Sequence, residues 1–169
     1  MVGERAVTPE DLVEIEAIKR LKYRYLRCLD QKRWDEIVDC FTPDVVADYS
    51  SGKYHYDGRD AIVGFLRESL GDTSALTSHR VHHPEIDLTG ATTATGTFAM
   101  DDVVIFQKMN LTVRGAAFYT DEFVKQDGEW KIARIGYRRT YEEMESRDRP
   151  GLQLTASWWE TGGQSDIDV

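Results

Sequence analysis

Apolar side chains recur every three or four residues along the first part of the chain, the spacing of one buried face of an α-helix. This stripe runs from Leu12 to Leu29. Thr8, Pro9 and Glu10 precede it, and a capping hydroxyl, a proline and an acid in that order are typical of a helix start. The pattern predicts a first helix that begins after Thr8 and ends at about Leu29.

Two further segments have helical spacing. Residues 33–41 form the shorter one, which we expect to stop at Thr42-Pro43, and residues 59–70 form the longer one, followed by Gly71. Between them, residues 45–49 and 53–56 flank the turn sequence Ser50-Ser51-Gly52, which predicts a small β-hairpin.

The hydrophobic period changes to two after Ser78, as expected for strands with one buried face. Turn sequences divide this part into residues 79–88, 92–107, 111–125 and 130–141. These lengths predict an antiparallel meander of four long strands, which must curl because sheets twist. The chain therefore predicts an α+β fold, a cone-shaped, curved antiparallel or mixed sheet closed on one side by three N-terminal helices. Such a cone leaves a pocket between sheet and helices.

The tail has a different composition from the rest of the chain. We assign residues 1–145 to the folded domain and residues 146–169 to a C-terminal tail. Trp158-Trp159 could cover the mouth of the pocket, and the polar end from Gly162 onward is expected to be disordered.

Charge and length narrow the function classes. The 169 residues suit one domain, and 21 Lys and Arg against 30 Asp and Glu give a net charge of −9, which argues against nucleic-acid binding. The first ten residues lack the apolar core of a signal peptide, and no apolar run is long enough to span a membrane. We expect a soluble cytoplasmic protein in which Cys28 and Cys40 are reduced, buried thiols without metal-ligand spacing.

Asp30 stands at the end of the first predicted helix, where the helix dipole favours cations. Residues that break a local rule in this way gather at functional sites. Our hypothesis is that Asp30 accepts a hydrogen bond from a histidine and that the pair transfers a proton inside an apolar pocket. On an unbroken helix, Tyr25 and Asp30 point about 140° apart. The two side chains can meet only if the helix ends before Asp30. In an unbroken helix Tyr23, seven residues before Asp30, is the better-placed partner.

Three of the four histidines lie between Ser78 and Pro84, and imidazole is the natural acid and base near neutral pH. On one extended strand they cannot all point the same way, which disfavours a metal site. Strict alternation places His82 on the face of Ile86 and turns His79 to the other face. A bulge before Pro84 would reverse this phase and turn His79 inward.

Acidic and basic residues also occur on predicted inner faces of later strands. Asp102 shares a face with Phe98 and Met100, where a carboxylate needs a partner. In the last strand, Tyr137, Arg139 and Tyr141 share a face. Arg139 could balance Asp102 or hold a substrate oxygen.

These positions and the order of elements resemble the nuclear transport factor 2-like superfamily, in particular its SnoaL-like and scytalone dehydratase-like branch, and within it the bile acid 7α-dehydratases. The resemblance spans residues 15–143. It rests on the segments Ile15-Glu16-Ala17-Ile18-Lys19, Tyr25-Leu26-Arg27-Cys28-Leu29-Asp30, Pro84-Glu85-Ile86, Thr92-Thr93-Ala94-Thr95-Gly96, Ala117-Phe118-Tyr119-Thr120-Asp121 and Gly136-Tyr137.

The resemblance implies a cone-shaped α+β barrel, no cofactor, a homo-oligomer (trimer or dimer) and a pocket for a small apolar cyclic molecule. It implies Tyr25, Asp30 and His79 as the catalytic residues, with Asp102 and Arg139 as a second acid and an arginine. We follow it in choosing His79, and keep His82 as a second candidate. The residues expected to bind the substrate are His82, Asp102, Arg139, Phe98, Met100 and Tyr137.

The function expected from these residues is a cofactor-independent lyase, most simply a dehydratase, acting on an apolar cyclic substrate such as a steroid or polyketide by Asp/His acid-base catalysis. One alternative is an isomerase or cyclase that uses the same proton abstraction. The other is a non-catalytic small-molecule-binding protein, because one fold hosts many functions.

Overall fold

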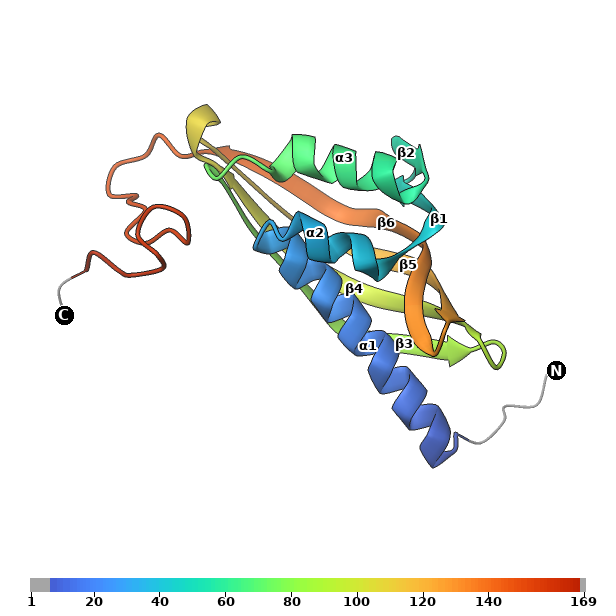
Figure 1. Cartoon of the computed structure of the whole chain (residues 1–169). Helices are drawn as coiled ribbons and strands as arrows, with labels where there is room; N and C mark the ends of the chain where they lie inside the picture. Colours follow the sequence, from blue (N-terminus) through green and yellow to red (C-terminus); the bar gives the residue numbers. More distant parts are fainter. Residues whose placement is uncertain (1–6, 168–169) are drawn as a thin grey trace.

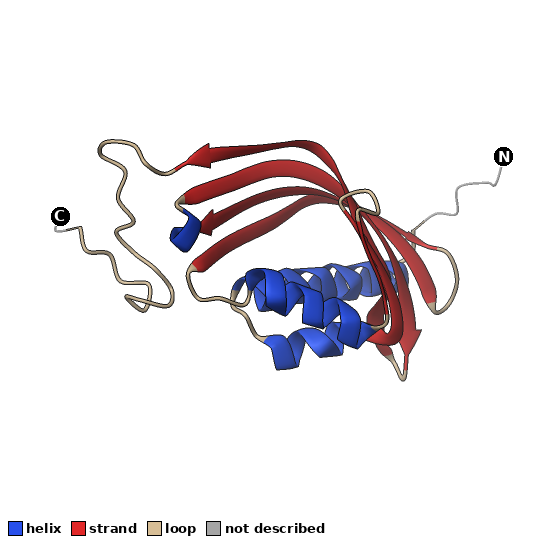
Figure 2. Cartoon of the chain, turned by 90° about the horizontal axis from the view of Figure 1, so that it is seen from above, coloured by secondary structure: helices blue, strands red, loops and turns tan. Residues whose placement is uncertain are grey.

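A curved six-stranded sheet wraps around three α-helices in the computed structural model, which describes residues 7–167 (Figure 1, Figure 2). The helices are α1 (Pro9–Asp30), α2 (Trp34–Ile37) and α3 (Arg59–Leu70). The strands are β1 (Phe41–Tyr49), β2 (Tyr54–Asp57), β3 (Ala75–Leu88), β4 (Thr93–Phe106), β5 (Leu111–Gln126) and β6 (Glu129–Ser146). Short 3₁₀ turns occupy Val38–Cys40 and Gln107–Met109.

The strands follow the order β2-β1-β6-β5-β4-β3. All neighbours are antiparallel except β1 and β6, so the sheet is mixed. Its edges, β2 and β3, do not pair with each other, and the sheet is therefore a curved open layer. The predicted α+β class, the four-stranded meander and the curvature are confirmed, whereas the barrel implied by the resemblance is not closed.

Helix α1 begins with the predicted cap. Thr8 Oγ1 accepts from Asp11 N at 3.2 Å, and Asp11 Oδ2 accepts from Thr8 N at 2.8 Å, so the two residues satisfy each other's free backbone donors. The helix continues through Asp30, so the expectation that it ends earlier is wrong. Tyr25 and Asp30 consequently leave the helix in different directions.

The second helix is shorter than predicted. It covers Trp34–Ile37 and continues as a 3₁₀ turn, and β1 already begins at Phe41. Pro43 does not stop an element here, because it lies inside β1 where the pairing with β6 is irregular between Phe41 and Val46. A strand tolerates proline at such an irregularity, where the missing N–H is not needed for the ladder.

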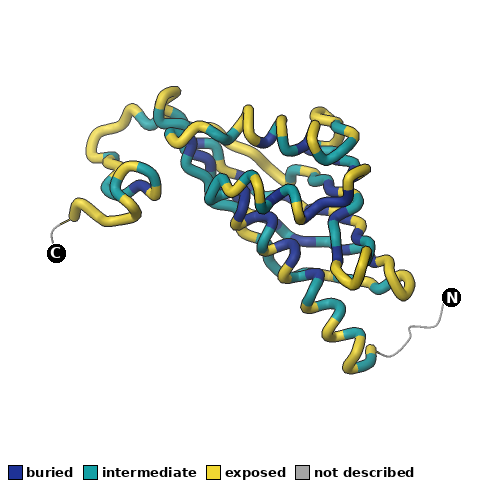
Figure 3. The backbone as a smooth tube through the Cα atoms, in the orientation of Figure 1, coloured by how far each residue is buried: buried dark blue, intermediate teal, exposed yellow. Residues whose placement is uncertain are grey.

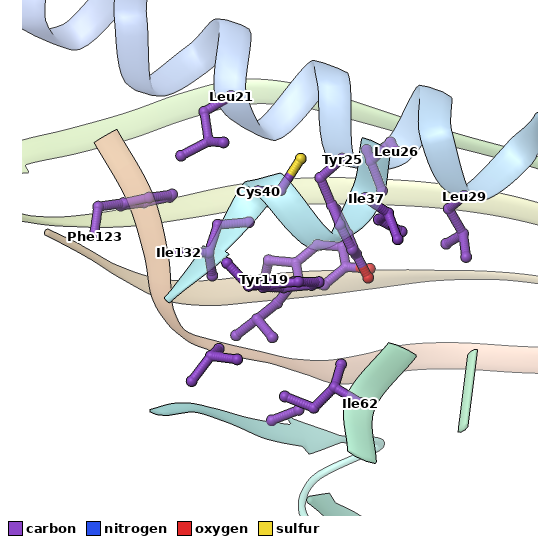
Figure 4. Close-up of a cluster of buried hydrophobic side chains, with 14 of the residues drawn as sticks. Leu21, Tyr25, Leu26, Leu29, Ile37, Cys40, Ile62, Tyr119, Phe123 and Ile132 are labelled. Carbon is purple, nitrogen blue, oxygen red and sulfur yellow. The ribbon is translucent and has the colours of Figure 1, made fainter. Parts of the chain in front are cut away.

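The core lies between the helices and the concave face of the sheet (Figure 3). Side chains from α1, the 3₁₀ turn, α3, β5 and β6 interlock there (Figure 4). Cys28 and Cys40 are buried free thiols, as predicted. Among the described residues, no helix combines the length and apolar character that a membrane crossing requires.

Residues 147–167, the described part of the chain after β6, form a tail without helix or strand that extends from one end of the sheet (Figure 1). Glu160 accepts from Gln107 Nε2 at 3.4 Å, and Lys32 Nζ lies 5.8 Å from the Trp159 ring centroid. Of the end predicted to be disordered, the structure describes Gly162 to Ile167, and residues 168–169 lie outside the described range. Residues 1–6, part of the segment judged to lack a signal peptide, also lie outside it.

Candidate active site

A cavity of about 410 Å³ lies between α1, α3 and the concave face of the sheet. Its wall is largely aliphatic and aromatic and includes five tyrosines, with ionisable His, Asp, Arg and Glu side chains contributed by β3, β4 and β6. The lining includes Tyr25, Tyr49, His79, Asp102, Tyr119, Tyr137, Arg139 and Glu142. A cavity of this size and composition suits a small, mainly apolar ligand.

Asp30 and His79 form the hydrogen-bonded pair that the sequence predicts. His79 Nδ1 lies 2.7 Å from Asp30 Oδ1. Asp30 also accepts from the His79 backbone N–H at 2.9 Å and from Thr77 Oγ1 at 2.8 Å. The last residue of α1 is thereby joined to β3 by three hydrogen bonds, which fix both the carboxylate and the imidazole ring.

The protonation state of this pair follows from its surroundings. Burial would raise the pKa of Asp30, but the hydrogen bonds from His79 and Thr77 outweigh burial, and the pKa is lowered. Asp30 is therefore ionised at neutral pH and can only accept hydrogen bonds. Nδ1 of His79 must then be the donor to Asp30, which leaves Nε2 as the ring nitrogen that can exchange a proton with a ligand.

A β-bulge decides which histidine faces the cavity. The register of β3 and β4 shifts between His82 and Glu85, and His83 has a positive φ of 46°. The alternation is reversed at this point, so that His79 lines the cavity. His82 instead lines an outer groove and pairs with Asp101, with Nε2 and Oδ2 3.0 Å apart. The prediction from strict alternation was wrong because it lacked the bulge.

Tyr25 extends from α1 toward the sheet (Figure 4) and lines the same cavity. Its hydroxyl lies 3.3 Å from the hydroxyl of Tyr49. Burial raises the pKa of Tyr25 well above its usual value, so the phenol keeps its proton at neutral pH. Tyr25 is therefore a hydrogen-bond and proton donor that shares a cavity with the His79 imidazole.

Asp102 and Arg139 form a two-pronged ion pair across β4 and β6. Nη1 of Arg139 contacts Asp102 Oδ1, and Nη2 lies 2.9 Å from Oδ2. Burial acts to lower the pKa of Arg139, but Asp102 outweighs it and raises the pKa. The guanidinium also lies 5.1 Å from the centroid of the Tyr137 ring, which lines the same cavity.

A second bulge, in β6, brings the carboxylate of Glu142 to the cavity. In the β5–β6 ladder, Ala117 pairs with Arg139 but Ala116 pairs with Tyr141, so Thr140 is an extra residue. Tyr141, predicted to share the face of Arg139, is instead 53% exposed. Glu142 takes the inward position and lies 3.1 Å from Arg139 Nε, an ion pair without hydrogen-bond geometry.

Gly115 leaves room for this arginine. It pairs with Glu142 across the ladder, and a Cβ at residue 115 would lie 3.0 Å from Arg139 Nη1 and 2.6 Å from the Tyr141 carbonyl oxygen. A side chain at this position would therefore push against both the guanidinium and the backbone of β6.

The remaining predicted site residues divide between the cavity and the core. Met100 and Tyr137 line the cavity. Phe98 is fully buried beside Phe123, with ring centroids 6.3 Å apart, and does not line the cavity. Of the residues expected to bind substrate, the structure thus does not bring His82 and Phe98 to the cavity. Among the described residues after Glu142, none lines the cavity. Trp158 and Trp159, expected to cover its mouth, are therefore not part of its wall.

A buried ion pair behind the cavity was missed by the sequence reasoning. Lys22 Nζ lies 2.7 Å from Asp121 Oδ2, and both side chains are fully buried. The ammonium also lies 3.3 Å from the ring centroid of Tyr119, whose ring lines the cavity. Burial lowers the pKa of Lys22 and raises that of Asp121. The signal was a lysine on the apolar stripe of α1, in phase with Ile18 and Tyr25.

Metal-ligating side chains are not grouped in the part of the chain that the structure describes, where no cluster of three His, Cys, Asp or Glu could hold an ion. The chemistry that these residues can supply is proton transfer, hydrogen bonding to oxygen and charge stabilisation.

Comparison with known proteins places the chain in a family. Residues 10–136 match the model of the SnoaL-like domain. The uncharacterized protein Rv2910c of Mycobacterium tuberculosis strain H37Rv is 25% identical over 128 residues, which cover 75% of this chain and 86% of that protein.

Two solved structures extend the likeness. A protein of Novosphingobium aromaticivorans, provisionally named a scytalone dehydratase, superposes with a TM-score of 0.75 at 27% identity, over 88% of this chain and all of that one. The hexachlorocyclohexane dehydrochlorinase LinA-type3 of Novosphingobium barchaimii has a TM-score of 0.72 at 18% identity, over 85% of this chain and 94% of that one.

The fold is thus the NTF2-like fold that the resemblance implied. None of the relatives named above is a bile acid dehydratase, so that narrower resemblance stays a prediction. Because the family model matches three quarters of its length, the chain belongs to the SnoaL-like domain family.

Proposed function

We propose that this protein is a cofactor-independent lyase of the dehydratase kind, acting on an apolar cyclic substrate such as a steroid or polyketide. The observation that carries the proposal is the Asp30–His79 pair at the wall of a mainly apolar cavity. An imidazole oriented by a carboxylate is a general base near neutral pH. Self-association into a dimer or trimer and a cytoplasmic location are part of the same proposal.

The reaction begins at His79. Its Nε2 removes a proton from a carbon adjacent to a carbonyl or conjugated system of the substrate, while Asp30 stabilises the imidazolium through the Nδ1 hydrogen bond. The electrons of the C–H bond form the new double bond, and the C–O bond of the neighbouring carbon breaks. A base held at 2.7 Å by its orienting partner loses little rotational freedom in this step.

Tyr25 completes the proton balance. Its phenol gives a proton to the departing hydroxyl, which leaves as water, and the resulting phenolate regains a proton from the His79 imidazolium. A phenol with a raised pKa is protonated at the start of each turnover. Asp102, which lies opposite His79 on the neighbouring strand, and Arg139 position the substrate oxygens.

The names of the two structural neighbours described above favour a lyase. One is a provisional dehydratase and the other a dehydrochlorinase, so both names describe loss of a small group from a carbon skeleton. At these identities the argument is one of fold and analogy.

A mass-resolved substrate screen tests the proposal. The purified protein is incubated with hydroxylated steroid and polyketide-like ring compounds. The product masses, measured by mass spectrometry, are compared with those from a parallel incubation with Asp30→Asn. We expect loss of one water with the parent protein only. A product of unchanged mass would indicate an isomerase or cyclase instead. Binding of equal strength by both proteins with no turnover would indicate a binding protein.

A further inference from the structure

The charges around the cavity are unequal in number. Arg139 is the one Lys or Arg among the described residues that line it, and it stands beside two lining carboxylates, Asp102 and Glu142. The carboxylates that line the cavity therefore outnumber its Lys and Arg side chains by one. An anionic group entering this space would add to that excess of negative groups.

The guanidinium of Arg139 is already engaged by protein carboxylates. Asp102 accepts a hydrogen bond from each terminal nitrogen, Glu142 lies 3.1 Å from Nε, and the Tyr137 ring covers one face at 5.1 Å. A ligand carboxylate could form the same two-pronged pair with both terminal nitrogens only by displacing Asp102. The Asp102 side chain is 3% exposed, so displacement would leave a buried carboxylate without its partner.

Other cations near the cavity are also engaged. Lys22 is paired with Asp121 behind the Tyr119 ring, and Lys32 donates to the carbonyl oxygens of Leu70 and Ala75. Neither lysine lines the cavity. The polar groups left for a ligand are mainly hydroxyls, those of the five tyrosines, which suit neutral hydroxyl and carbonyl oxygens.

We infer that this cavity selects an uncharged, oxygen-bearing ring compound and rejects the same ring when it carries a carboxylate, with Glu142 and the engagement of Arg139 by Asp102 as the determinants. This selectivity rests on the proposed function for the identity of the site. It concerns binding, however, and can hold whether or not the bound compound is dehydrated.

A matched pair of probes tests the inference. 2-Naphthamide and 2-naphthoate have nearly the same shape, but the second is an anion at neutral pH. Calorimetric titration of the parent protein should give at least tenfold tighter binding of the amide. Because the readout is binding, a negative dehydration screen leaves this result interpretable, and a reversed preference would not by itself remove the lyase proposal.

Variants assign the selectivity to the named residues. Glu142→Gln should improve naphthoate binding several-fold relative to naphthamide, and Asp102→Asn, which frees the arginine, should improve it by tenfold or more. The matched control is Glu143→Gln, which removes the same charge from the next residue of β6, outside the cavity lining, and should leave the ratio unchanged. Circular dichroism verifies that each variant is folded, and Glu142→Gln, at a half-exposed side chain, keeps the test open if Asp102→Asn unfolds.

Three results would overturn the inference. These are naphthoate binding as tightly as naphthamide to the parent protein, a ratio that stays the same in both Glu142→Gln and Asp102→Asn, and failure of the uncharged naphthamide to bind at all.

Discussion

His79 and Asp102 lie directly opposite each other on β3 and β4, so both side chains project from the same face of the sheet into one cavity. Each is held by a different partner, His79 by Asp30 from α1 and Asp102 by Arg139 from β6. The two carboxylates therefore have different tasks in the proposed site. Asp30 orients a base, and Asp102 neutralises an arginine.

Asp30→Asn should lower kcat by about 10²–10⁴-fold, because the amide can present a donor to Nδ1 and favour the wrong imidazole tautomer. Turnover is measured on the substrate that the mass screen identifies. Asp101→Asn is a matched control, since Asp101 pairs with the outer His82 in a similar contact and lies outside the cavity lining. Turnover of Asp30→Asn within a few-fold of the parent would remove Asp30 from the mechanism.

Tyr25→Phe should reduce kcat by about 10²-fold or more with a smaller effect on KM, because the variant lacks the donor to the leaving hydroxyl. The lost contact with Tyr49 should lower the free energy of unfolding by only about 1 kcal/mol. Tyr23→Phe, on the same helix but 42% exposed, is the control and should match the parent in both measurements. An unchanged kcat in Tyr25→Phe would assign the proton delivery to another group.

Lys22→Met should lower the free energy of unfolding by about 3–5 kcal/mol, because it leaves the Asp121 carboxylate buried without a partner. Urea denaturation measures the change. The control is Lys19→Met, which breaks a pair with Glu16 on the exposed side of the same helix and should cost about 0–1 kcal/mol. The double variant Lys22→Met with Asp121→Leu should recover part of the loss, since neither charge then remains.

Stability at low pH should report on Asp30. Its folded-state pKa is lowered, so it binds its proton more weakly in the folded than in the unfolded chain. The stabilisation that Asp30 gives the folded state is fully present above its pKa in the unfolded chain, about 3.9. It is lost as the pH falls through its lower pKa in the folded chain. The difference in unfolding free energy between the parent and Asp30→Asn should thus shrink as the pH falls below about 4. A difference that grows on acidification would contradict the lowered pKa.

Periodicity was enough to predict α1, α3 and the meander, because each has a long and regular apolar face. The short α2 was overestimated, since four residues carry too little of a helical period to separate a turn of α-helix from the 3₁₀ turn after it. Sequence rules predict that a helix ends at Pro43, because proline usually ends a helix. In the structure the irregular pairing of β1 with β6 accommodates this proline inside a strand.

The parts of the site that escaped prediction depend on contacts distant in sequence or on single extra residues. Asp30 and His79 were paired from chemistry and resemblance, but strand alternation alone selected His82. Lys22 and Asp121 are 99 residues apart, and each was visible only as a charge on an apolar face. Glu142 faces the cavity only because Thr140 is an extra residue in β6, and the alternation of apolar and polar residues gives no sign of such an insertion.

The positive φ at His83 has a consequence for reading other members of this family. Spacing, as much as residue type, determines which imidazole faces the cavity. A homologue with one residue fewer between the positions of His79 and Pro84 would keep the His79 position inward without a bulge, whereas a homologue of the same length that lacks the bulge would turn the positions of Arg80 and His82 inward. Assigning the base by matching histidines alone would select the wrong residue in such a chain.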